Sequence, residues 1–316
     1  MTESIMIPRR FRGPEASANG GYTCGTLAEL VDADVVEVTL RKPPPLDVAM
    51  VVERDGEAIR VLHDGELVAE ARPGILEPMS FHSKAFGGMR NGHIYLPARF
   101  RKTRLYPLLV VHDGSDYLNF ANMKVVLDNL IHDLEIPDMI VAFTDSPDRL
   151  REYANDESHA RFITEELLPD LTSRLPILDR PQARCLMGAS FGAVAAFSTA
   201  WRYPDVWGRL LLQSGSFAFT DIGKRNRRGP LFDRVVEFVN QVRDAPAAVS
   251  ERVFVSCGVY ESLIYENRSL VPLLVETGMQ VRFVEARDGH NWENWRDRLR
   301  EGLSWLFPGP LMFVYE

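Results

Sequence analysis

The residues best suited to chemistry form the pentapeptide GASFG at positions 188–192, which places Ser190 between small residues. A serine hydroxyl is a poor nucleophile at neutral pH, so it needs a base and hydrogen-bond donors for the charge that develops during attack on a carbonyl. Glycines on both sides allow the sharp strand-to-helix turn that presents such a serine. The apolar run before it and the small apolar residues 191–201 after it fit a strand and a helix. The pattern indicates acyl transfer with Ser190 as nucleophile.

The base for this nucleophile is expected downstream of it. Enzymes that carry the motif on an open sheet place nucleophile, acid and histidine in that chain order. Of the seven histidines, only His290 follows Ser190. It comes after the strand-like residues 280–285, so a loop at the sheet edge could bring its imidazole over the serine. His290 is therefore the predicted base.

Several carboxylates lie between the serine and the histidine, and Glu261 is the best placed. It follows residues 252–258, which are typical of a buried parallel strand, and an acid at the tip of that strand could accept the His290 Nδ1 proton. Glu266 and Asp288 are the alternatives. We expect the first to lie on a helix and the second in a turn beside the histidine.

The elements that must position these residues begin after a Gly- and Pro-rich stretch near residues 74–80. Beyond it, strand-like and helix-like segments alternate, which predicts a mostly parallel sheet. The expected strands are 93–97, 105–112, 139–144, 183–187, 210–213, 253–257 and 281–285. We expect an α/β catalytic domain at residues 79–316 and a small strand-rich α+β domain at residues 1–78. In the latter, a helix at 21–31 precedes strands at 35–42, 49–56, 57–65 and 66–74, and Asp-Gly pairs at 55 and 64 suit tight hairpins.

Composition narrows the function classes. The 316 residues are 46% hydrophobic, with a net charge of -8 and a pI near 5.5, which argues against binding to nucleic acid or to anionic membranes. The N-terminus lacks the apolar core of a signal peptide and no run could span a bilayer, so we expect a cytoplasmic protein. No metal-ligand spacing and no nucleotide-binding glycine motif are apparent, so neither a metal nor a cofactor is expected.

Residues 80–308 resemble the enterochelin esterase and esterase D group of α/β-hydrolases. The similar stretches are YPLLVVHDGSDYL, REY at 151–153, EELLPDL, CLMGASFGAVAAF, LLLQSGSF, CGVYESLIYENRSL and DGHNWENWRDRLREGLSWLF. The resemblance implies the α/β-hydrolase fold, with Ser190, His290 and Glu261 as the triad. It also implies an oxyanion hole formed by the backbone NH groups of Phe191 and Ser115. His112 stands where the family usually has an aliphatic residue.

Substrate-binding residues are harder to derive. Arg151 and Tyr153 could line a pocket or brace a loop, and Trp292 could form an aromatic wall or pack in the core. A basic cluster at residues 224–228 suits either an anionic substrate or a solvated loop. The set of candidates for substrate binding is Asp113, Arg151, Tyr153 and Trp292.

The first domain is similar to the front half of a hotdog-fold thioesterase in residues 11–25 and 36–47. A small β-sandwich is the alternative, and in either case we expect a structural or homodimer-forming role. The whole sequence predicts a serine hydrolase of small carboxylic esters, with siderophore-type esters as one substrate class. An acyltransferase or acyl-CoA thioesterase of the same fold, and a non-catalytic binding protein, are the alternatives.

Overall fold

The computed structural model describes residues 3–14, 16–33, 36–220 and 229–310. The chain divides into two compact units. One consists of Met1–Ile75 and Pro97–Arg99, and the other of Leu76–Leu96 and Phe100–Glu316.

The first unit is built on one antiparallel sheet of five strands in the order β1-β3-β4-β5-β2. Helix α1 (Gly20–Ala28) lies between β1 and β2 in the chain, and its Leu27 joins the core that Ile59 and Val61 form on the sheet. The five strands are β1 (Ser4–Met6), β2 (Glu37–Leu40), β3 (Ala49–Asp55), β4 (Ala58–His63) and β5 (Glu66–Arg72).

Tight turns set the register of this sheet. Asp55 pairs with Ala58, and His63 pairs with Glu66, so each hairpin has a two-residue loop. In the second loop both Asp64 and Gly65 have positive φ, 52° and 77°. This is the backbone of a type I′ turn, whose twist matches that of the strands it joins. The hairpins expected from the two Asp-Gly pairs are confirmed.

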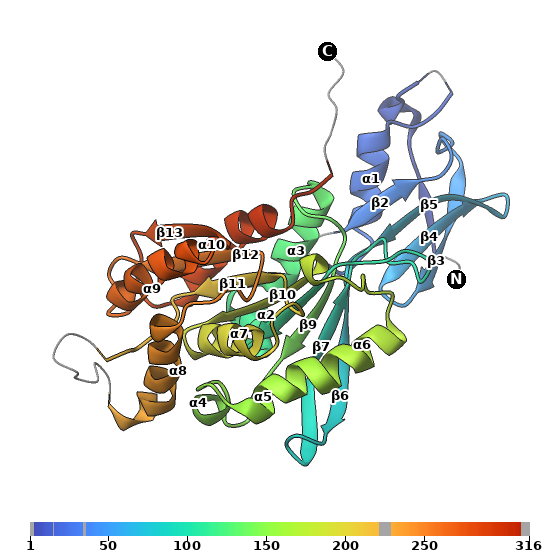
Figure 1. Cartoon of the computed structure of the whole chain (residues 1–316). Helices are drawn as coiled ribbons and strands as arrows, with labels where there is room; N and C mark the ends of the chain where they lie inside the picture. The colour runs from blue at the N-terminus through green and yellow to red at the C-terminus, as the bar shows by residue number, and fades with distance from the viewer. Residues whose placement is uncertain (1–2, 15, 34–35, 221–228, 311–316) are drawn as a thin grey trace. The chain divides into compact units, whose positions relative to one another are not determined.

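The second unit contains an eight-stranded sheet in the order β13-β12-β11-β10-β8-β9-β7-β6 (Figure 1). Strand β7 pairs with β9 in antiparallel fashion, whereas the pairs from β9 to β13 are parallel. The strands are β6 (Ile75–Ser83), β7 (Gly88–Leu96), β8 (Leu108–His112), β9 (Ile140–Thr144), β10 (Arg184–Ala189), β11 (Arg209–Gln213), β12 (Arg252–Gly258) and β13 (Gln280–Ala286). The mostly parallel sheet is confirmed, and its parallel strands all end at one edge.

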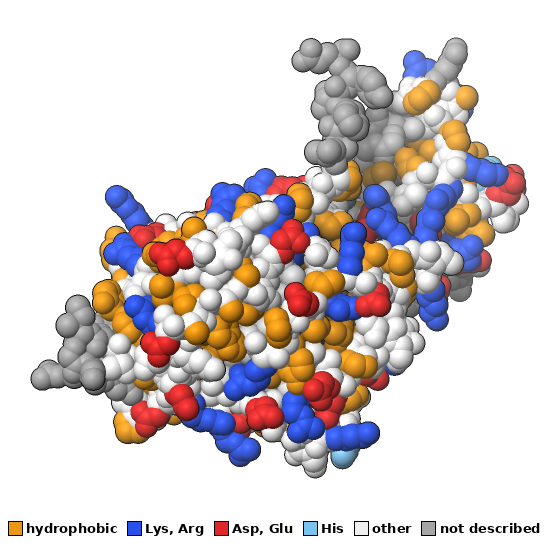
Figure 2. Space-filling model, viewed as in Figure 1, with side chains coloured by type: hydrophobic (Ala, Val, Ile, Leu, Met, Phe, Trp, Pro, Cys, Tyr) orange, Lys and Arg blue, Asp and Glu red, His pale blue; other side chains and the backbone are white. Residues whose placement is uncertain are grey.

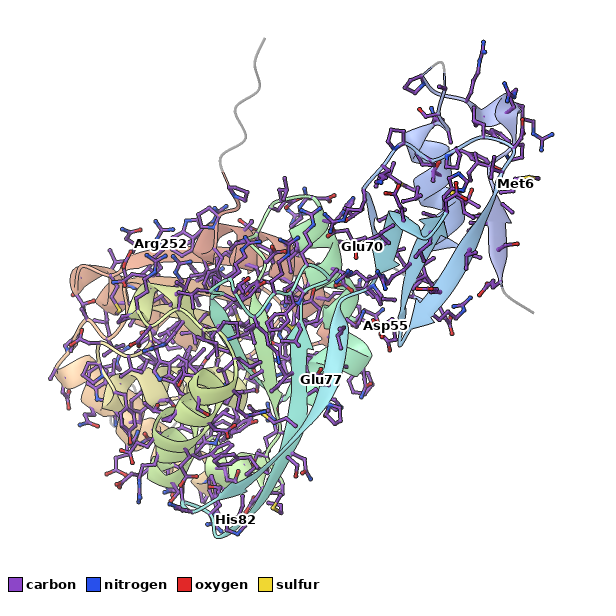
Figure 3. The ribbon with its side chains drawn as sticks, turned by 90° about the vertical axis from the view of Figure 1, so that its right-hand side faces the viewer. Met6, Asp55, Glu70, Glu77, His82 and Arg252 are labelled. Atoms are coloured by element: carbon purple, nitrogen blue, oxygen red, sulfur yellow. The ribbon has the colours of Figure 1, made fainter. Side chains whose placement is uncertain are left out.

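Strand β6 was not expected, because Gly74 and Pro78 read as a break in the chain. It occupies the edge of the sheet, with Glu77 and His82 along it (Figure 3). An edge strand has one side without hydrogen-bonded neighbours, so a proline can be accommodated there. Tertiary position thus allows a strand where the local sequence indicated a linker.

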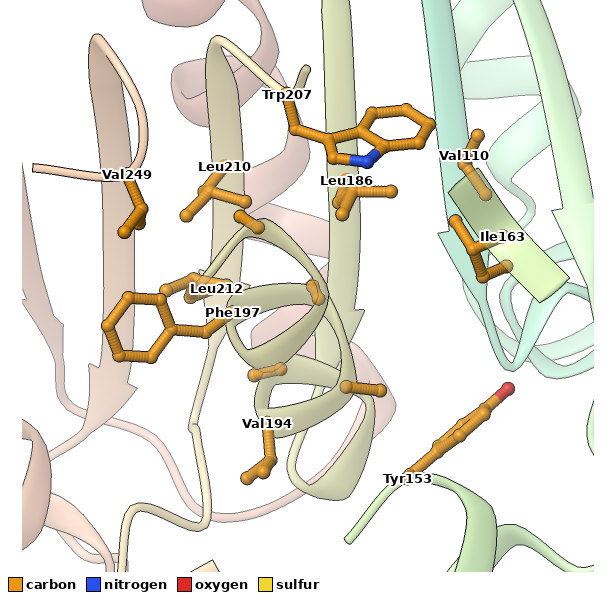
Figure 4. Packing of buried hydrophobic residues seen from close by; sticks show 14 of the residues in the cluster. Val110, Tyr153, Ile163, Leu186, Val194, Phe197, Trp207, Leu210, Leu212 and Val249 are labelled. Atoms are coloured by element: carbon orange, nitrogen blue, oxygen red, sulfur yellow. The ribbon is translucent and has the colours of Figure 1, made fainter. Parts of the chain in front are cut away.

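Helices cover both faces of the large sheet. On one face, α7 packs its Val194 and Phe197 among Leu186, Leu210 and Leu212 (Figure 4). Helices α6, α8 and α9 add to the same core, while α3 and α10 pack on the opposite face. The helices of this unit are α2 (Gly114–Phe120), α3 (Met123–His132), α4 (Arg149–Glu152), α5 (Glu157–Arg161), α6 (Leu168–Arg174), α7 (Phe191–Arg202), α8 (Asp233–Asp244), α9 (Ile264–Glu276) and α10 (Trp292–Leu306); the π-helical Phe162–Leu167 joins α5 to α6.

Candidate active site

Ser190 occupies the turn between β10 and α7. Its backbone has φ 57° and ψ -118°, a combination that non-glycine residues rarely adopt. A Cβ added to Gly188 would lie 2.4 Å from the backbone of Gly192, so these two glycines allow the strand and the helix to approach. The turn therefore projects the serine at the carboxyl end of β10.

Ser190 is half-buried, and its hydroxyl has one hydrogen-bond partner among the described residues. Its Oγ lies 3.1 Å from Oγ of Ser216, in the segment that follows β11. Among the described residues no hydrogen bond joins Ser190 to His290. The serine is thus paired with a neighbouring hydroxyl rather than with the expected base.

His290 and Glu261 lie together at the ends of β13 and β12. The Nδ1 atom of His290 is 2.7 Å from Oε2 of Glu261. Because a carboxylate only accepts, Nδ1 carries the proton and Nε2 is left as the basic nitrogen. Of the two alternative acids, Glu266 is buried in α9, and the backbone carbonyl of Asp288 accepts from the NH of Tyr260.

The second oxygen of Glu261 is held by three donors. Oε1 accepts from the Ser214 hydroxyl at 2.7 Å, the Gly258 NH at 2.7 Å and the Asn294 amide at 3.2 Å. The indole NH of Trp295 donates to Ser214 Oγ at 2.9 Å. Sequence reasoning gave no role to Ser214 or Asn294, although both fall in the stretches QSGSF and HNWENW that carried the resemblance. Their spacing relative to the serine and the histidine was the available signal.

The two backbone NH groups expected to bind the oxyanion differ in whether they already donate a hydrogen bond. The NH of Phe191 is the first of α7, where backbone NH groups have no partner within the helix, and none is found for it among the described residues. The NH of Ser115 instead donates to Asp145 Oδ1 at 3.0 Å, and the Ser115 hydroxyl donates to Oδ2 of the same carboxylate. Phe191 is available to an oxyanion, whereas Asp145 occupies the donor of Ser115.

Asp113 is a buried carboxylate that forms an ion pair with a partly exposed arginine, next to the turn that carries Ser190. Arg149 donates to both of its carboxylate oxygens, at 2.7 and 2.8 Å, and to the carbonyl of Ala189 at 3.2 Å. Burial raises the pKa of the Asp113 carboxyl, against the opposing effect of Arg149. A Cβ at Gly192 would lie 3.2 Å from Asp113 Oδ2. The pair braces the turn before Ser190; sequence reasoning selected Arg151 and missed Arg149.

The other three candidates have different surroundings. Tyr153 is fully buried and its hydroxyl accepts from the Asp113 NH at 3.2 Å, so it braces the same loop. Arg151 is exposed. Trp292 is half-buried, with ring centroids 5.1 Å from Tyr117 and 4.7 Å from Trp295.

The unusual His112 is accommodated by a second histidine. Its Nδ1 donates to the Met187 carbonyl at 2.8 Å, and its Nε2 lies 3.0 Å from Nε2 of His159. Both side chains are buried, and burial lowers the pKa of His112 to about 4 and that of His159 well below its usual value. Two neutral imidazoles can share one proton in this contact, so the pair satisfies His112 without a charge.

Three other expectations concern the basic cluster, metal binding and membrane-spanning helices. The basic cluster at residues 224–228 lies outside the described residues. In the part of the chain that the structure describes, no three His, Cys, Asp or Glu side chains are grouped to hold a metal ion. Nor does any helix of that part have the length and hydropathy needed to cross a bilayer. On the face seen in Figure 2, basic and acidic side chains are interspersed.

Most of this chain is similar to proteins of one known family. Residues 83–306 match the model of the esterase family, described as "Putative esterase". An iron(III) enterobactin esterase of Dickeya dadantii is 28% identical over 214 residues, which are 64% of this chain and 48% of that protein. The chain thus spans about half the length of this relative.

Solved structures of esterases have a fold similar to that of this chain. A ferulic acid esterase aligns with a TM-score of 0.65 and 21% identity, over 74% of this chain and 98% of its own. An enterochelin esterase from Shigella flexneri aligns with a TM-score of 0.64 and 17% identity, over 96% of this chain and 91% of its own. The chain has an α/β-hydrolase-like fold.

Proposed function

Since this chain belongs to the esterase family, we propose that it hydrolyses carboxylic esters with Ser190 as nucleophile, His290 as base and Glu261 as the group that orients the base. One observation carries the proposal. The segment after β11 hydrogen-bonds to Ser190 through Ser216 and to Glu261 through Ser214, and Glu261 in turn bonds to His290. One three-residue segment, Ser214–Ser216, therefore bonds both to the nucleophile and to the carboxylate that holds the base.

The reaction follows from these positions. Ser190 directs its hydroxyl proton toward His290, whose Nε2 takes that proton while Oγ bonds to the ester carbonyl carbon. The carbon–oxygen bond to the leaving alcohol then breaks, and His290 returns the proton to that oxygen. Water attacks the acyl-enzyme, again giving its proton to His290, and the acid leaves as Ser190 is restored. Glu261 holds the imidazole with Nε2 free throughout.

The developing oxyanion needs donors. We assign one to the Phe191 NH. It lies at the N-terminal end of α7, where the helix dipole stabilises negative charge. We assign the other to the Ser115 NH, once the substrate oxygen replaces the carboxylate of Asp145. The bond from this NH to the Asp145 carboxylate supports the assignment, because the NH already donates to an anionic oxygen.

The substrate class is proposed as a small ester with an aromatic group. Trp292 lies next to Phe120, with ring centroids 5.7 Å apart, and 58% of Phe120 is exposed. Exposed aromatic rings near the base offer a wall for a planar group. The related proteins are named for enterobactin and for ferulic acid, so enterobactin and a ferulate ester are suitable probes.

We also propose that residues 1–78 form an accessory domain of partial hotdog type and residues 79–316 the catalytic domain. The single antiparallel sheet, with α1 between β1 and β2 in the chain, supports this type over a sandwich, which needs two sheets. A homodimer formed through the accessory domain would appear as a doubled mass in solution.

The test of function compares the protein with Ser190→Ala. We expect hydrolysis of p-nitrophenyl acetate and labelling by a fluorophosphonate probe, and a loss in kcat of roughly 10^6 in the variant. Ser173→Ala, at an exposed helical serine, is the matched control. Hydrolysis by Ser190→Ala at the unsubstituted rate would disprove the proposal. Faster turnover when an alcohol is added as acceptor would instead indicate an acyltransferase.

A further inference from the structure

We propose that Ser216 is a positioning residue whose hydroxyl donates a hydrogen bond to Oγ of Ser190 as that oxygen becomes a nucleophile. The inference rests on the proposed ester hydrolysis and goes beyond it, because nothing in the triad requires a second hydroxyl. The two Oγ atoms are 3.1 Å apart, and only 2% of Ser216 is exposed.

The backbone holds the two serines side by side. The NH of Ser190 donates to the Gln213 carbonyl at 2.9 Å, and the NH of Ser216 donates to the Ser190 carbonyl at 3.2 Å. Ser214 has a φ of 47°, which turns the chain away from the direction of β11. A Cβ at Gly215 would lie 2.1 Å from the ring of Phe217, so this bend requires glycine at that position. The position of Ser216 is therefore set by the same strand pair that presents Ser190.

Proton counting gives the direction of the hydrogen bond. A serine hydroxyl has one proton and two lone pairs. For attack, Ser190 must give its proton to His290, so toward Ser216 it can only accept. Ser216 Oγ has Ser190 as its one side-chain partner among the described residues, which leaves its proton free for this bond. A donor aimed at Oγ favours the negative charge that appears there as its proton leaves.

The opposite direction makes a different prediction. If Ser190 donated to Ser216, the contact would hold the nucleophile away from His290, and its removal would speed the reaction. The two directions therefore give opposite signs for the same substitution, and kinetics can separate them.

The experiment uses the full chain and four variants. We expect Ser216→Ala to lower kcat for p-nitrophenyl acetate about tenfold with little change in KM, as for one lost hydrogen bond to a charged group. The rate of fluorophosphonate labelling of Ser190 should fall by the same factor. Ser216→Thr, which keeps a hydroxyl, should have both rates close to those of the unsubstituted chain. Ser216→Val, which has the shape of threonine but no hydroxyl, should have the lowered rates. Ser198→Ala, at a buried serine within α7, should leave both rates unchanged.

The outcomes are distinguishable. Ser216→Thr and Ser216→Val have side chains of the same shape, and only the first has a hydroxyl. If the two variants have equal melting temperatures, a difference in their rates reports the loss of the hydroxyl and not a change in packing, even if the alanine variant folds poorly. Unchanged or faster turnover in Ser216→Ala, or equal rates for Thr and Val, would overturn the role of Ser216 while leaving Ser190 as nucleophile. A wild-type chain that neither hydrolyses the ester nor reacts with the probe would overturn the proposed function itself.

Discussion

Nδ1 of His290 lies 2.7 Å from a Glu261 carboxylate whose side chain is completely buried, although 40% of the histidine side chain is exposed. The buried partner is fixed by three further donors, so the exposed imidazole is anchored from inside the protein. The contact fixes the imidazole tautomer with its proton on Nδ1, so Nε2 is the nitrogen that can act as the base.

Replacement of Glu261 by glutamine should therefore lower activity without removing the side chain. The amide NH₂ can donate to Nδ1, which would put the imidazole proton on Nε2 and abolish its basicity. We expect a loss in kcat of about 10^4, as for the equivalent change in a serine triad. Steady-state kinetics with p-nitrophenyl acetate measures it.

Asp288→Asn is the control for this prediction, since Asp288 is close to His290 in sequence and its contact with Tyr260 uses only the backbone. It should keep the unsubstituted kcat. A larger loss in Asp288→Asn than in Glu261→Gln would show that the acid has been misassigned.

The carboxylate of Asp145 stands where we place the substrate oxyanion, so its charge should oppose catalysis. Asp145→Asn keeps the size of the group and an acceptor for the Ser115 NH but removes the charge. We expect kcat to rise about fivefold, the scale of roughly 1 kcal/mol for a partly solvated charge pair. Asp148→Asn, an exposed change in the same loop, should have no effect. A fall in kcat for Asp145→Asn would instead make Asp145 a support for the Ser115 loop.

The ion pair between Arg149 and Asp113 should contribute to stability. Arg149→Met leaves the buried carboxylate of Asp113 without its cation, which should cost about 2 kcal/mol, less than in a fully buried pair because 34% of the Arg149 side chain is exposed. Urea unfolding measures the change. The exposed Arg151→Met should alter the free energy of unfolding by less than about 0.5 kcal/mol. Adding Asp113→Asn to Arg149→Met should recover part of the loss; no recovery would show that the charge of Asp113 is not the cause.

The pair His112 and His159 should make the fold sensitive to acid. Both have a lowered pKa when folded, so below pH 6.5 the unfolded chain binds protons that the folded chain does not. Stability is then present above pH 6.5 and is lost as the pH falls toward 4, by up to about 1.4 kcal/mol per pH unit for each histidine.

Urea unfolding at pH 7, 6 and 5 tests this slope. The double variant His112→Val, His159→Phe should show a shallower loss of stability with falling pH than the unsubstituted chain. The exposed His132→Gln should keep the original slope. Equal slopes in all three proteins would exclude the buried pair as the source.

Local sequence determined the features that depend on neighbouring residues. The glycines around Ser190 specify a sharp turn, and the Asp-Gly pairs specify two hairpins, because each requires a backbone conformation that few residues adopt. Alternating apolar and amphipathic segments predicted the parallel sheet. Chain order alone selected His290, since no other histidine follows the serine.

Only the tertiary structure decided which distant side chains meet. Arg149 rather than Arg151 reaches Asp113, Ser216 rather than His290 bonds to Ser190, and Asp145 occupies the Ser115 NH. These partners are 26 to 36 residues apart in the chain. Their contacts depend on which strands are adjacent and in what register, and a hydrogen bond tolerates an error of only a few tenths of an ångström. Residue type and spacing therefore predict which reaction the chain can catalyse, while the register of the sheet determines which hydrogen-bond partner each side chain of the site has.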